Sequence, residues 1–229
     1  MRILVTRPRG DAEETAAKLI ALGHEAVIAP LLDIRIRPRH EIGLDGVQAF
    51  LVTSTNGIRA LAACTARRDL PVLAVGAQSA DTAHALGFAR VTDAGGDAAA
   101  LANLAITALV PRNGALVHAS GSETRGNLAE ILATRGFAVR REVLYDAVAA
   151  EAFPPDVVSA FDTLDTALFF SPRTAQIFAD LVAKENLSCE TMCAFCISEA
   201  AADELRGLPF RDVRAAAMPN QDALLALLG

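Results

Sequence analysis

The sequence predicts an α/β protein with two similar lobes, each built on a doubly wound parallel sheet, joined by a two-stranded ribbon. Three observations lead to this prediction: short apolar runs without a polar face, helical periodicity between the runs, and a strand–helix plan that occurs twice. The chain has 229 residues, of which 52 % are apolar and 21 % charged, as is typical of a compact globular protein.

The predicted strands are short runs of apolar residues, the clearest being 3–5, 50–52, 72–75 and 168–170. These runs lack the alternation of a sheet with one wet face, so we expect helices on both sides of each sheet. The segments between them have apolar residues at helical spacing, followed by glycines that can end a helix: Ala16, Leu19 and Ile20 before Gly23, and Leu128, Ile131 and Leu132 before Gly136.

An internal repeat links these elements. "RILVTRPRGDAEETAAKLIALGHEAVIAPLLDI" aligns with "ALVHASGSETRGNLAEILATRGFAVRREVLYDA" at one offset, which places Leu4 on Val117 and Gly23 on Gly136. A second unit, "FLVTSTNGIRAL", pairs with "LFFSPRTAQIF". The chain therefore reads as two copies of one α/β plan.

Two segments differ from this plan. Residues 30–40 and 139–150 mix apolar and charged residues, as in "IRIR". We expect both to be exposed ribbon strands that act as a hinge between the lobes.

Five loops rich in hydrogen-bond donors or small residues follow predicted strands: residues 6–10, 53–57, 76–79, 119–125 and 171–174. In a parallel sheet each such loop leads into a helix N-terminus, where unpaired N–H groups and the helix dipole favour anions. The alternative is that the loops only cap helices, each cap contributing about 1 kcal/mol. Caps alone do not require Arg7, Arg125 and Arg173 at these loops.

Charge and hydropathy exclude several classes of protein. The net charge is −6 with both signs interspersed, which argues against nucleic-acid binding. No apolar run is long enough for a membrane span or a signal peptide, so we expect a cytoplasmic protein.

The cysteines and histidines give little sign of a metal, a cofactor or a nucleophile. Cys189, Cys193 and Cys196 form a CxxxCxxC cluster without an evident fourth ligand, so buried thiols are favoured over a metal site. His118 lies in an apolar run and is interpreted as a core or strand-end residue rather than a base. Because no nucleophile or dinucleotide-binding motif is present, we expect no cofactor.

Tyr145 is the only tyrosine of the chain and lies in the second ribbon segment. Its phenol could donate a hydrogen bond to a leaving hydroxyl, or it could cap a buried strand end. Sequence position leaves both roles open.

Six motifs, in order along nearly the whole chain, resemble uroporphyrinogen-III synthases: "ILVTRP", "TSTNGI", "AVGAQSA", "VLYDAV", "FFSPRTA" and "CISEAAADEL". The resemblance implies two flavodoxin-like lobes. The first lobe would contain residues 1–34 and 150–229, and the second residues 40–141. Residues 35–39 and 142–149 would form the linker.

The resemblance also implies a lyase that acts as a monomer, without cofactor or metal, on hydroxymethylbilane, a linear tetrapyrrole with eight carboxylates. Loss of its hydroxyl as water gives an azafulvene cation. Ring D is then attacked at its substituted position, and a spiro intermediate closes with ring D inverted, giving uroporphyrinogen III. Because the substrate supplies its own nucleophile, the protein needs only to assist the departure of water and to hold the chain.

By position, the resemblance assigns Tyr145 to hydroxyl departure. It implies that cleft-lining loops bind the substrate carboxylates through Arg7, Thr53, Ser54, Asn56, Gly76, Ser79, Ser171, Arg173, Thr174 and Ser198. Many members have Gly-Pro-Thr-Thr-Ala where this chain has Ser-Glu-Ala-Ala-Ala at 198–202. The alternative is therefore a catalytically idle module of the same fold that binds an anionic small molecule or partner. For the synthase we expect substrate binding to weaken as salt rises.

Overall fold

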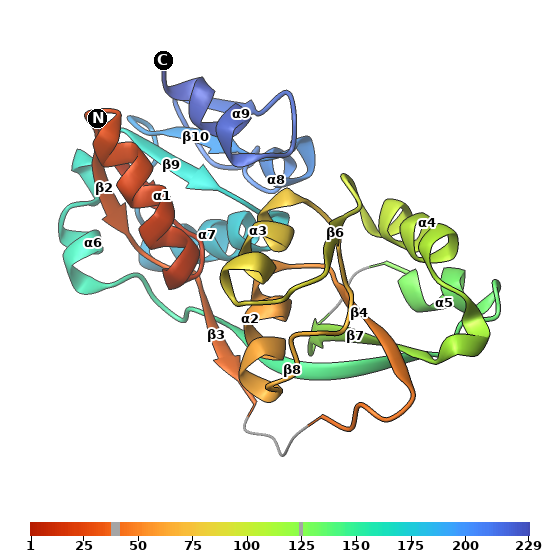
Figure 1. Cartoon of the computed structure of the whole chain (residues 1–229). Coiled ribbons are helices and arrows are strands. Elements are labelled where there is room, and N and C mark those ends of the chain that lie inside the picture. Colours follow the sequence, from red (N-terminus) through yellow and green to blue (C-terminus); the bar gives the residue numbers. More distant parts are fainter. Residues whose placement is uncertain (38–41, 124–125) are drawn as a thin grey trace. The chain divides into compact units, whose positions relative to one another are not determined.

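The computed structural model describes residues 1–37, 42–123 and 126–229 (Figure 1). Contacts divide the chain into two compact units, Met1–Asp33 with Val148–Gly229 (unit 1) and Ile34–Ala147 (unit 2). Arg125 of the predicted loop 119–125, and residues 38–41 at the predicted start of the second lobe, lie outside the described residues. Within the described ranges, no helix is both long and apolar enough to cross a membrane.

Unit 1 contains a sheet with the strand order β11-β10-β9-β1-β2, in which all neighbouring strands are parallel. Its strands are β1 (Arg2–Val5), β2 (Glu25–Ile28), β9 (Thr166–Phe169), β10 (Cys193–Cys196) and β11 (Asp212–Ala215). Its helices are α1 (Arg9–Ala21), α6 (Pro155–Ser159), α7 (Pro172–Glu185), α8 (Glu199–Asp203) and α9 (Gln221–Leu225), with 3₁₀ turns at Phe161–Thr163 and Ala226–Leu228.

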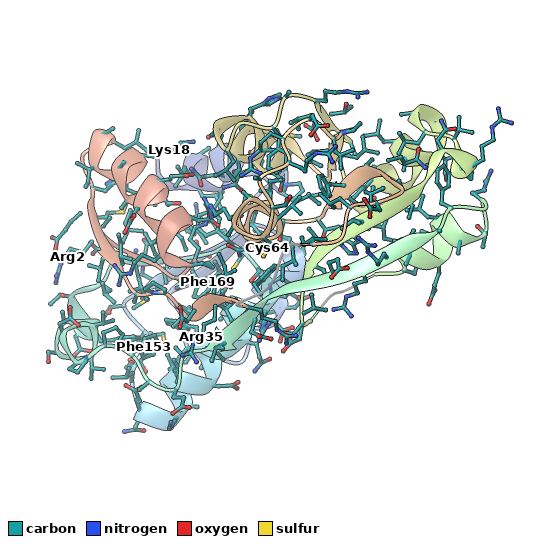
Figure 2. The ribbon with its side chains drawn as sticks, turned by 60° about the horizontal axis from the view of Figure 1, so that its bottom comes forward. Arg2, Lys18, Arg35, Cys64, Phe153 and Phe169 are labelled. Carbon is teal, nitrogen blue, oxygen red and sulfur yellow. The ribbon has the colours of Figure 1, made fainter. Side chains whose placement is uncertain are left out.

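Helices cover both faces of this sheet. On one face, Ile3 and Val5 of β1 pack in a cluster with Leu19 of α1 and Leu224 of α9. On the other face, the ring of Phe178 in α7 contacts four other rings at centroid distances of 5.0–6.1 Å: Phe153, Phe161, Phe169 and Phe210. Two of these residues, Phe153 and Phe169, are labelled in Figure 2. Burial on both faces explains why residues 3–5 of β1 are all apolar.

Unit 2 contains a sheet with the order β3-β8-β7-β4-β5-β6, parallel from β8 to β6. Its strands are β3 (Leu32–Ile36), β4 (Val47–Val52), β5 (Val72–Ala74), β6 (Val91–Asp93), β7 (Ala115–Gly121) and β8 (Val139–Ala149). Its helices are α2 (Thr55–Cys64), α3 (Ala77–Ala85), α4 (Ala98–Ala108) and α5 (Leu128–Ala133), with a 3₁₀ turn at Pro111–Asn113. β3 and β8 cross the boundary between the units.

Alternate residues of β4 face opposite sides of this sheet. Phe50 and Val52 join a core cluster with Ile58 of α2, whereas Ala49 and Leu51 join a second cluster formed with α4 and α5. The α/β prediction with helices on both sides of parallel sheets is thus confirmed.

The expectation that residues 139–150 form an exposed ribbon is wrong for part of the segment. Leu144 is fully buried, and Tyr145 is only 9 % exposed. The reason is that β8 lies inside the sheet, between β7 and β3. The N–H of Ala150 donates to Leu31 and that of Arg37 to Leu144, so β3 runs antiparallel to β8.

The two sheets follow one plan, as the internal repeat predicts. The order β2-β1-β9-β10-β11 of unit 1 corresponds to β8-β7-β4-β5-β6 of unit 2. Each unit therefore combines the first segment of one copy with the second segment of the other. The predicted helix-ending glycines, Gly23 and Gly136, have φ angles of 83° and 82°, the left-handed conformation that glycine adopts without strain.

Candidate active site

Ser54 links the end of β4 to the start of α2. Its Oγ accepts a hydrogen bond from the N–H of Gly57 at 3.0 Å, so it is the N-cap of α2. Asn56 lies in the first turn and is half-buried. A Cβ on Gly57 would lie 2.8 Å from the carbonyl oxygen of Ala119, so only glycine lets the helix approach β7 this closely.

Thr53 precedes this cap and is linked to a buried histidine. Its Oγ1 lies 3.2 Å from Nε2 of His118, which is on β7. Burial, and secondarily the positive charge of Arg141, lowers the pKa of His118 to about 4. The imidazole is therefore neutral at neutral pH, and His118 is a buried strand residue as expected.

Tyr145 lies beside the same cap. Its hydroxyl is 3.1 Å from Oγ of Ser54, and its ring packs against Gly121 at the end of β7. The structure thus brings together the predicted catalytic residue and one predicted substrate-binding residue, which are 91 positions apart in sequence.

Gly76 and Ser79 lie at the next strand end of unit 2. Gly76 is the N-cap of α3 with an extended backbone, and its carbonyl accepts from the N–H of Ser79 at 3.1 Å. Ser79 is buried. Because β4 and β5 are parallel neighbours, Thr53, Ser54 and Gly76 lie at one edge of the sheet.

The corresponding loop of unit 1 follows β9. Ser171 is the N-cap of α7: its Oγ accepts from the N–H of Thr174 at 3.1 Å. The Thr174 hydroxyl donates to the Ser171 carbonyl at 3.0 Å, and Thr174 is buried. Arg173 lies between them in the first turn and is half-buried.

Ser198 caps α8 at the end of β10, where its Oγ accepts from the N–H of Ala201 at 3.4 Å. The next residue, Glu199, is an exposed carboxylate that pairs with Arg206 at 3.1 Å. This negative charge in the first turn opposes a second anion there.

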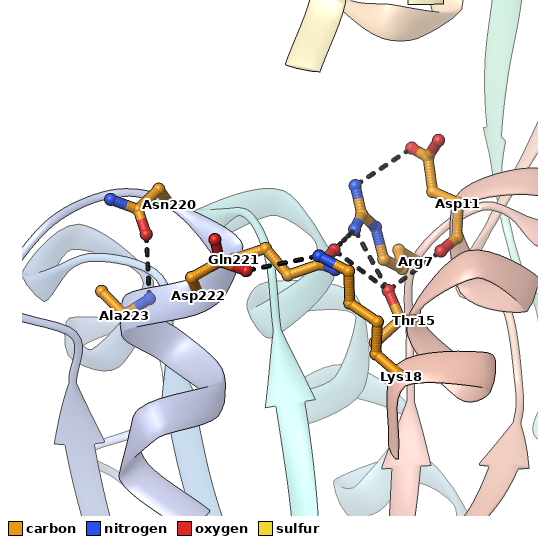
Figure 3. A network of polar contacts seen from close by, with 8 residues as sticks. All are labelled: Arg7, Asp11, Thr15, Lys18, Asn220, Gln221, Asp222 and Ala223. Atoms are coloured by element: carbon orange, nitrogen blue, oxygen red, sulfur yellow. Dashed lines mark hydrogen bonds and ion pairs between the residues drawn. The ribbon is translucent and has the colours of Figure 1, made fainter. Parts of the chain in front are cut away.

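Arg7 belongs to a network of polar contacts in unit 1, shown in Figure 3. It is only 5 % exposed and forms an ion pair with Asp11 at 3.3 Å. Its Nη1 donates to Thr15 at 3.2 Å and to Gln221 of α9 at 2.6 Å. The guanidinium also lies 4.2 Å from the ring centroid of Phe170. These contacts tie β1, α1 and α9 together.

The cysteines of the CxxxCxxC cluster are free and buried. Burial raises the pKa of Cys189 to about 12, and burial together with Glu199 raises that of Cys196 to about 12. Both thiols are therefore protonated at neutral pH. Among the residues that the structure describes, no group of three metal-ligating side chains could hold a metal ion.

Sequence reasoning missed several contacts of these residues. Arg7 and Asp11 are four residues apart at the start of α1, and this spacing could have suggested their ion pair. No local pattern indicates that Gln221 joins them, nor that Gly121 lies against the ring of Tyr145, because both contacts depend on how segments distant in sequence pack together.

Comparisons with known proteins identify the family. Residues 13–226 match the family model described as uroporphyrinogen-III synthase HemD. The chain belongs to the uroporphyrinogen-III synthase family. A comparison with curated protein sequences finds no match.

Solved synthases show the same fold. The uroporphyrinogen-III synthetase of Helicobacter pylori superposes with a TM-score of 0.69 at 18 % identity, over 100 % of this chain and 98 % of that one. A mutant uroporphyrinogen III synthase of Thermus thermophilus superposes with a TM-score of 0.51 at 18 % identity, over 100 % and 97 % of the two chains. Membership of the family makes the protein a cyclising lyase of haem and other tetrapyrrole biosynthesis.

Proposed function

We propose that the protein converts hydroxymethylbilane into uroporphyrinogen III, with Tyr145 as the catalytic residue. The observation that carries this proposal is the position of the chain's only phenol, 3.1 Å from the hydroxyl that caps α2. A hydrogen bond from this phenol to the hydroxymethyl oxygen assists cleavage of the C–O bond, and the oxygen leaves as water. A pyrrole proton released on ring closure balances the proton that the water carries away.

The substrate carboxylates would be bound mainly by neutral donors. The first turns of α2, α3 and α7 present backbone N–H groups beside the caps Ser54, Gly76 and Ser171. Thr53, Asn56, Ser79, Arg173 and Thr174 lie at the same strand ends and complete the proposed binding set. Ser198 is the least supported member, because Glu199 follows it.

Arg7 has a different proposed role. Its guanidinium is buried and paired with Asp11, so its charge is largely compensated within the fold. We assign it to holding the loop after β1 in place rather than to direct contact with a carboxylate.

We also propose that the enzyme is a monomer that acts in the cytoplasm without cofactor, nucleic acid or membrane partner. This proposal rests on the net charge of −6 with both signs interspersed along the sequence, on the sequence patterns described above and, for the monomer, on the family resemblance. Size-exclusion chromatography with light scattering tests the oligomeric state, and a larger assembly would contradict it.

The experiment that tests the function is turnover of hydroxymethylbilane with separation of isomers III and I. Wild type should give isomer III, and Tyr145→Phe should be slower by 10²–10⁴-fold, roughly the contribution of a positioned general acid, so that substrate closes on its own to isomer I. Loss of one hydrogen bond should cost only about 1 kcal/mol of stability, which chemical denaturation checks. Formation of isomer I alone by the wild type would favour the catalytically idle module.

A further inference from the structure

The pairing of β7 with β8 changes register beside Tyr145. Pairing is regular from Leu116 with Val139 to Ser120 with Val143, but Gly121 then faces Tyr145 instead of Leu144. One extra residue on β8 makes this a β-bulge, which redirects the side chains that follow it. Leu144 and Tyr145, adjacent in sequence, consequently belong to the same core cluster, whereas a regular strand would turn them to opposite faces.

The redirected ring fits only because residue 121 is glycine. A Cβ at Gly121 would lie 2.9 Å from both Cε2 and Cζ of Tyr145 and 3.2 Å from its hydroxyl oxygen. Gly121 does not have a positive φ angle, so alanine there would meet the ring without backbone strain. Glycine is therefore required at position 121 to make room for the phenol ring, and not to allow an unusual backbone conformation.

The backbone on which the ring rests is itself fixed. Nη2 of Arg141 donates to the carbonyls of Gly121 at 2.8 Å and Ser122 at 2.7 Å. Its Nε donates to Oγ of Ser120 at 3.0 Å. The N–H of Ser122 donates to the carbonyl of Tyr145 at 3.0 Å. These bonds hold the end of β7 against β8.

Ser54 fixes the other end of the phenol. Its oxygen already accepts from the Gly57 N–H at 3.0 Å, so its own proton is available for the Tyr145 oxygen 3.1 Å away. When Ser54 donates to it, the phenol keeps its proton for another acceptor. That acceptor would be the departing hydroxyl of the substrate.

We infer that Gly121 and Ser54 are positioning residues that set where the Tyr145 hydroxyl lies and in which direction its proton points. The inference rests on the proposed function of Tyr145. Gly121 sets the place of the ring through close packing, and Ser54 sets the direction of the proton through its hydrogen bond.

The first test is Gly121→Ala with Gly43→Ala as the control. Gly43 is exposed, and a Cβ there meets nothing within 4 Å. Gly121→Ala should lower kcat for isomer III by about 10- to 100-fold with little change in KM, as expected for a misplaced catalytic group. Gly43→Ala should behave as wild type. A wild-type kcat in Gly121→Ala would overturn the inference.

The second test separates positioning from substrate binding by Ser54. Ser54→Gly removes the hydroxyl but retains a residue that is favoured at an N-cap, whereas Ser54→Thr keeps the hydroxyl. We expect Ser54→Gly to lower kcat and Ser54→Thr to keep a kcat close to that of wild type. In a Tyr145→Phe background, neither Gly121→Ala nor Ser54→Gly should lower kcat further. Additive losses would overturn the inference. The Ser54 variants keep it testable if Gly121→Ala fails to fold.

The third test does not depend on turnover. The chain has one tyrosine and no tryptophan, so the tyrosine band of the near-UV circular dichroism spectrum reports Tyr145 alone. Gly121→Ala and Ser54→Gly should each change this band, and Gly43→Ala should not. An unchanged band in both variants would contradict the positioning role. If the wild type fails to turn over hydroxymethylbilane while the band responds as expected, the proposed function fails and the packing of the phenol stands.

Discussion

His118 shows how one buried side chain ties the candidate site to pH. It is 7 % exposed, its Nε2 lies 3.2 Å from the Thr53 hydroxyl, and Arg141 adds an unfavourable positive charge. A protonated imidazole there would lose its hydration and face a like charge, so the folded protein favours the neutral ring. Thr53 thus has a neutral hydrogen-bonding partner throughout the neutral pH range.

The pH dependence of stability should show this directly. The unfolded chain takes up a proton on His118 below about pH 6.5, whereas its pKa in the folded protein is lowered to about 4. The contribution of His118 to the free energy of unfolding is therefore fully present above pH 6.5. It is lost as pH falls toward 4, by on the order of 3 kcal/mol. Urea unfolding between these pH values should be steeply pH-dependent in wild type and flatter in His118→Gln. If the stabilities of wild type and His118→Gln change equally with pH, the lowered pKa of His118 is wrong.

The carboxylates with lowered pKa values do not obscure this window. Hydrogen bonds from Arg67 and Arg37 hold the pKa values of Asp69 and Asp146 at about 2. Such groups contribute stability that is lost only as pH falls from about 4 toward 2. The slope between pH 4 and 6.5 therefore reports mainly His118.

At the scale of elements, the caps have two roles that can be separated. Ser171 caps α7 and belongs to the proposed binding set, whereas Asp97 caps α4 by accepting from Ala99 and Ala100 and does not. Ser171→Ala and Asp97→Ala should each cost about 1 kcal/mol of stability. Only Ser171→Ala should also raise KM for hydroxymethylbilane. Equal KM values in the two variants would assign Ser171 to capping alone.

Elements with a strong local signal were predictable from the sequence. The apolar runs 3–5 and 50–52 fall within β1 and β4, and the polar residues after them begin or precede helices. The bulge in β8 was not predictable, because register depends on the pairing of strands that are distant in sequence. The same limit applies to Arg7, whose partner Gln221 is 214 positions away.

At the scale of the whole molecule, the internal repeat predicted that two similar sheets exist. The local pattern did not show which segments share a sheet. Unit 1 pairs β1 with β9, and unit 2 pairs β4 with β7, so each sheet joins segments from both copies. The spacing of apolar residues indicates which face of a strand is buried. It does not indicate which other strand lies beside it in the sheet. The family resemblance supplied the interleaved arrangement that periodicity could not.

The charge of the whole molecule decides the last prediction, and the structure changes what the sequence suggested. From the loop arginines we expected salt to weaken substrate binding, but Arg7 is buried and paired with Asp11. The remaining proposed donors are mostly neutral N–H groups and hydroxyls, while the protein carries a net charge of −6 and repels an anionic substrate. Salt screens this repulsion, so KM for hydroxymethylbilane should stay level or fall between about 0.05 and 0.5 M salt. Arg173→Gln serves as the matched variant, because Arg173 is the other cation among the proposed substrate-binding residues. If KM instead rises steeply in wild type and the rise disappears in Arg173→Gln, direct pairing of carboxylates with Arg173 dominates binding, and the neutral-donor account is wrong.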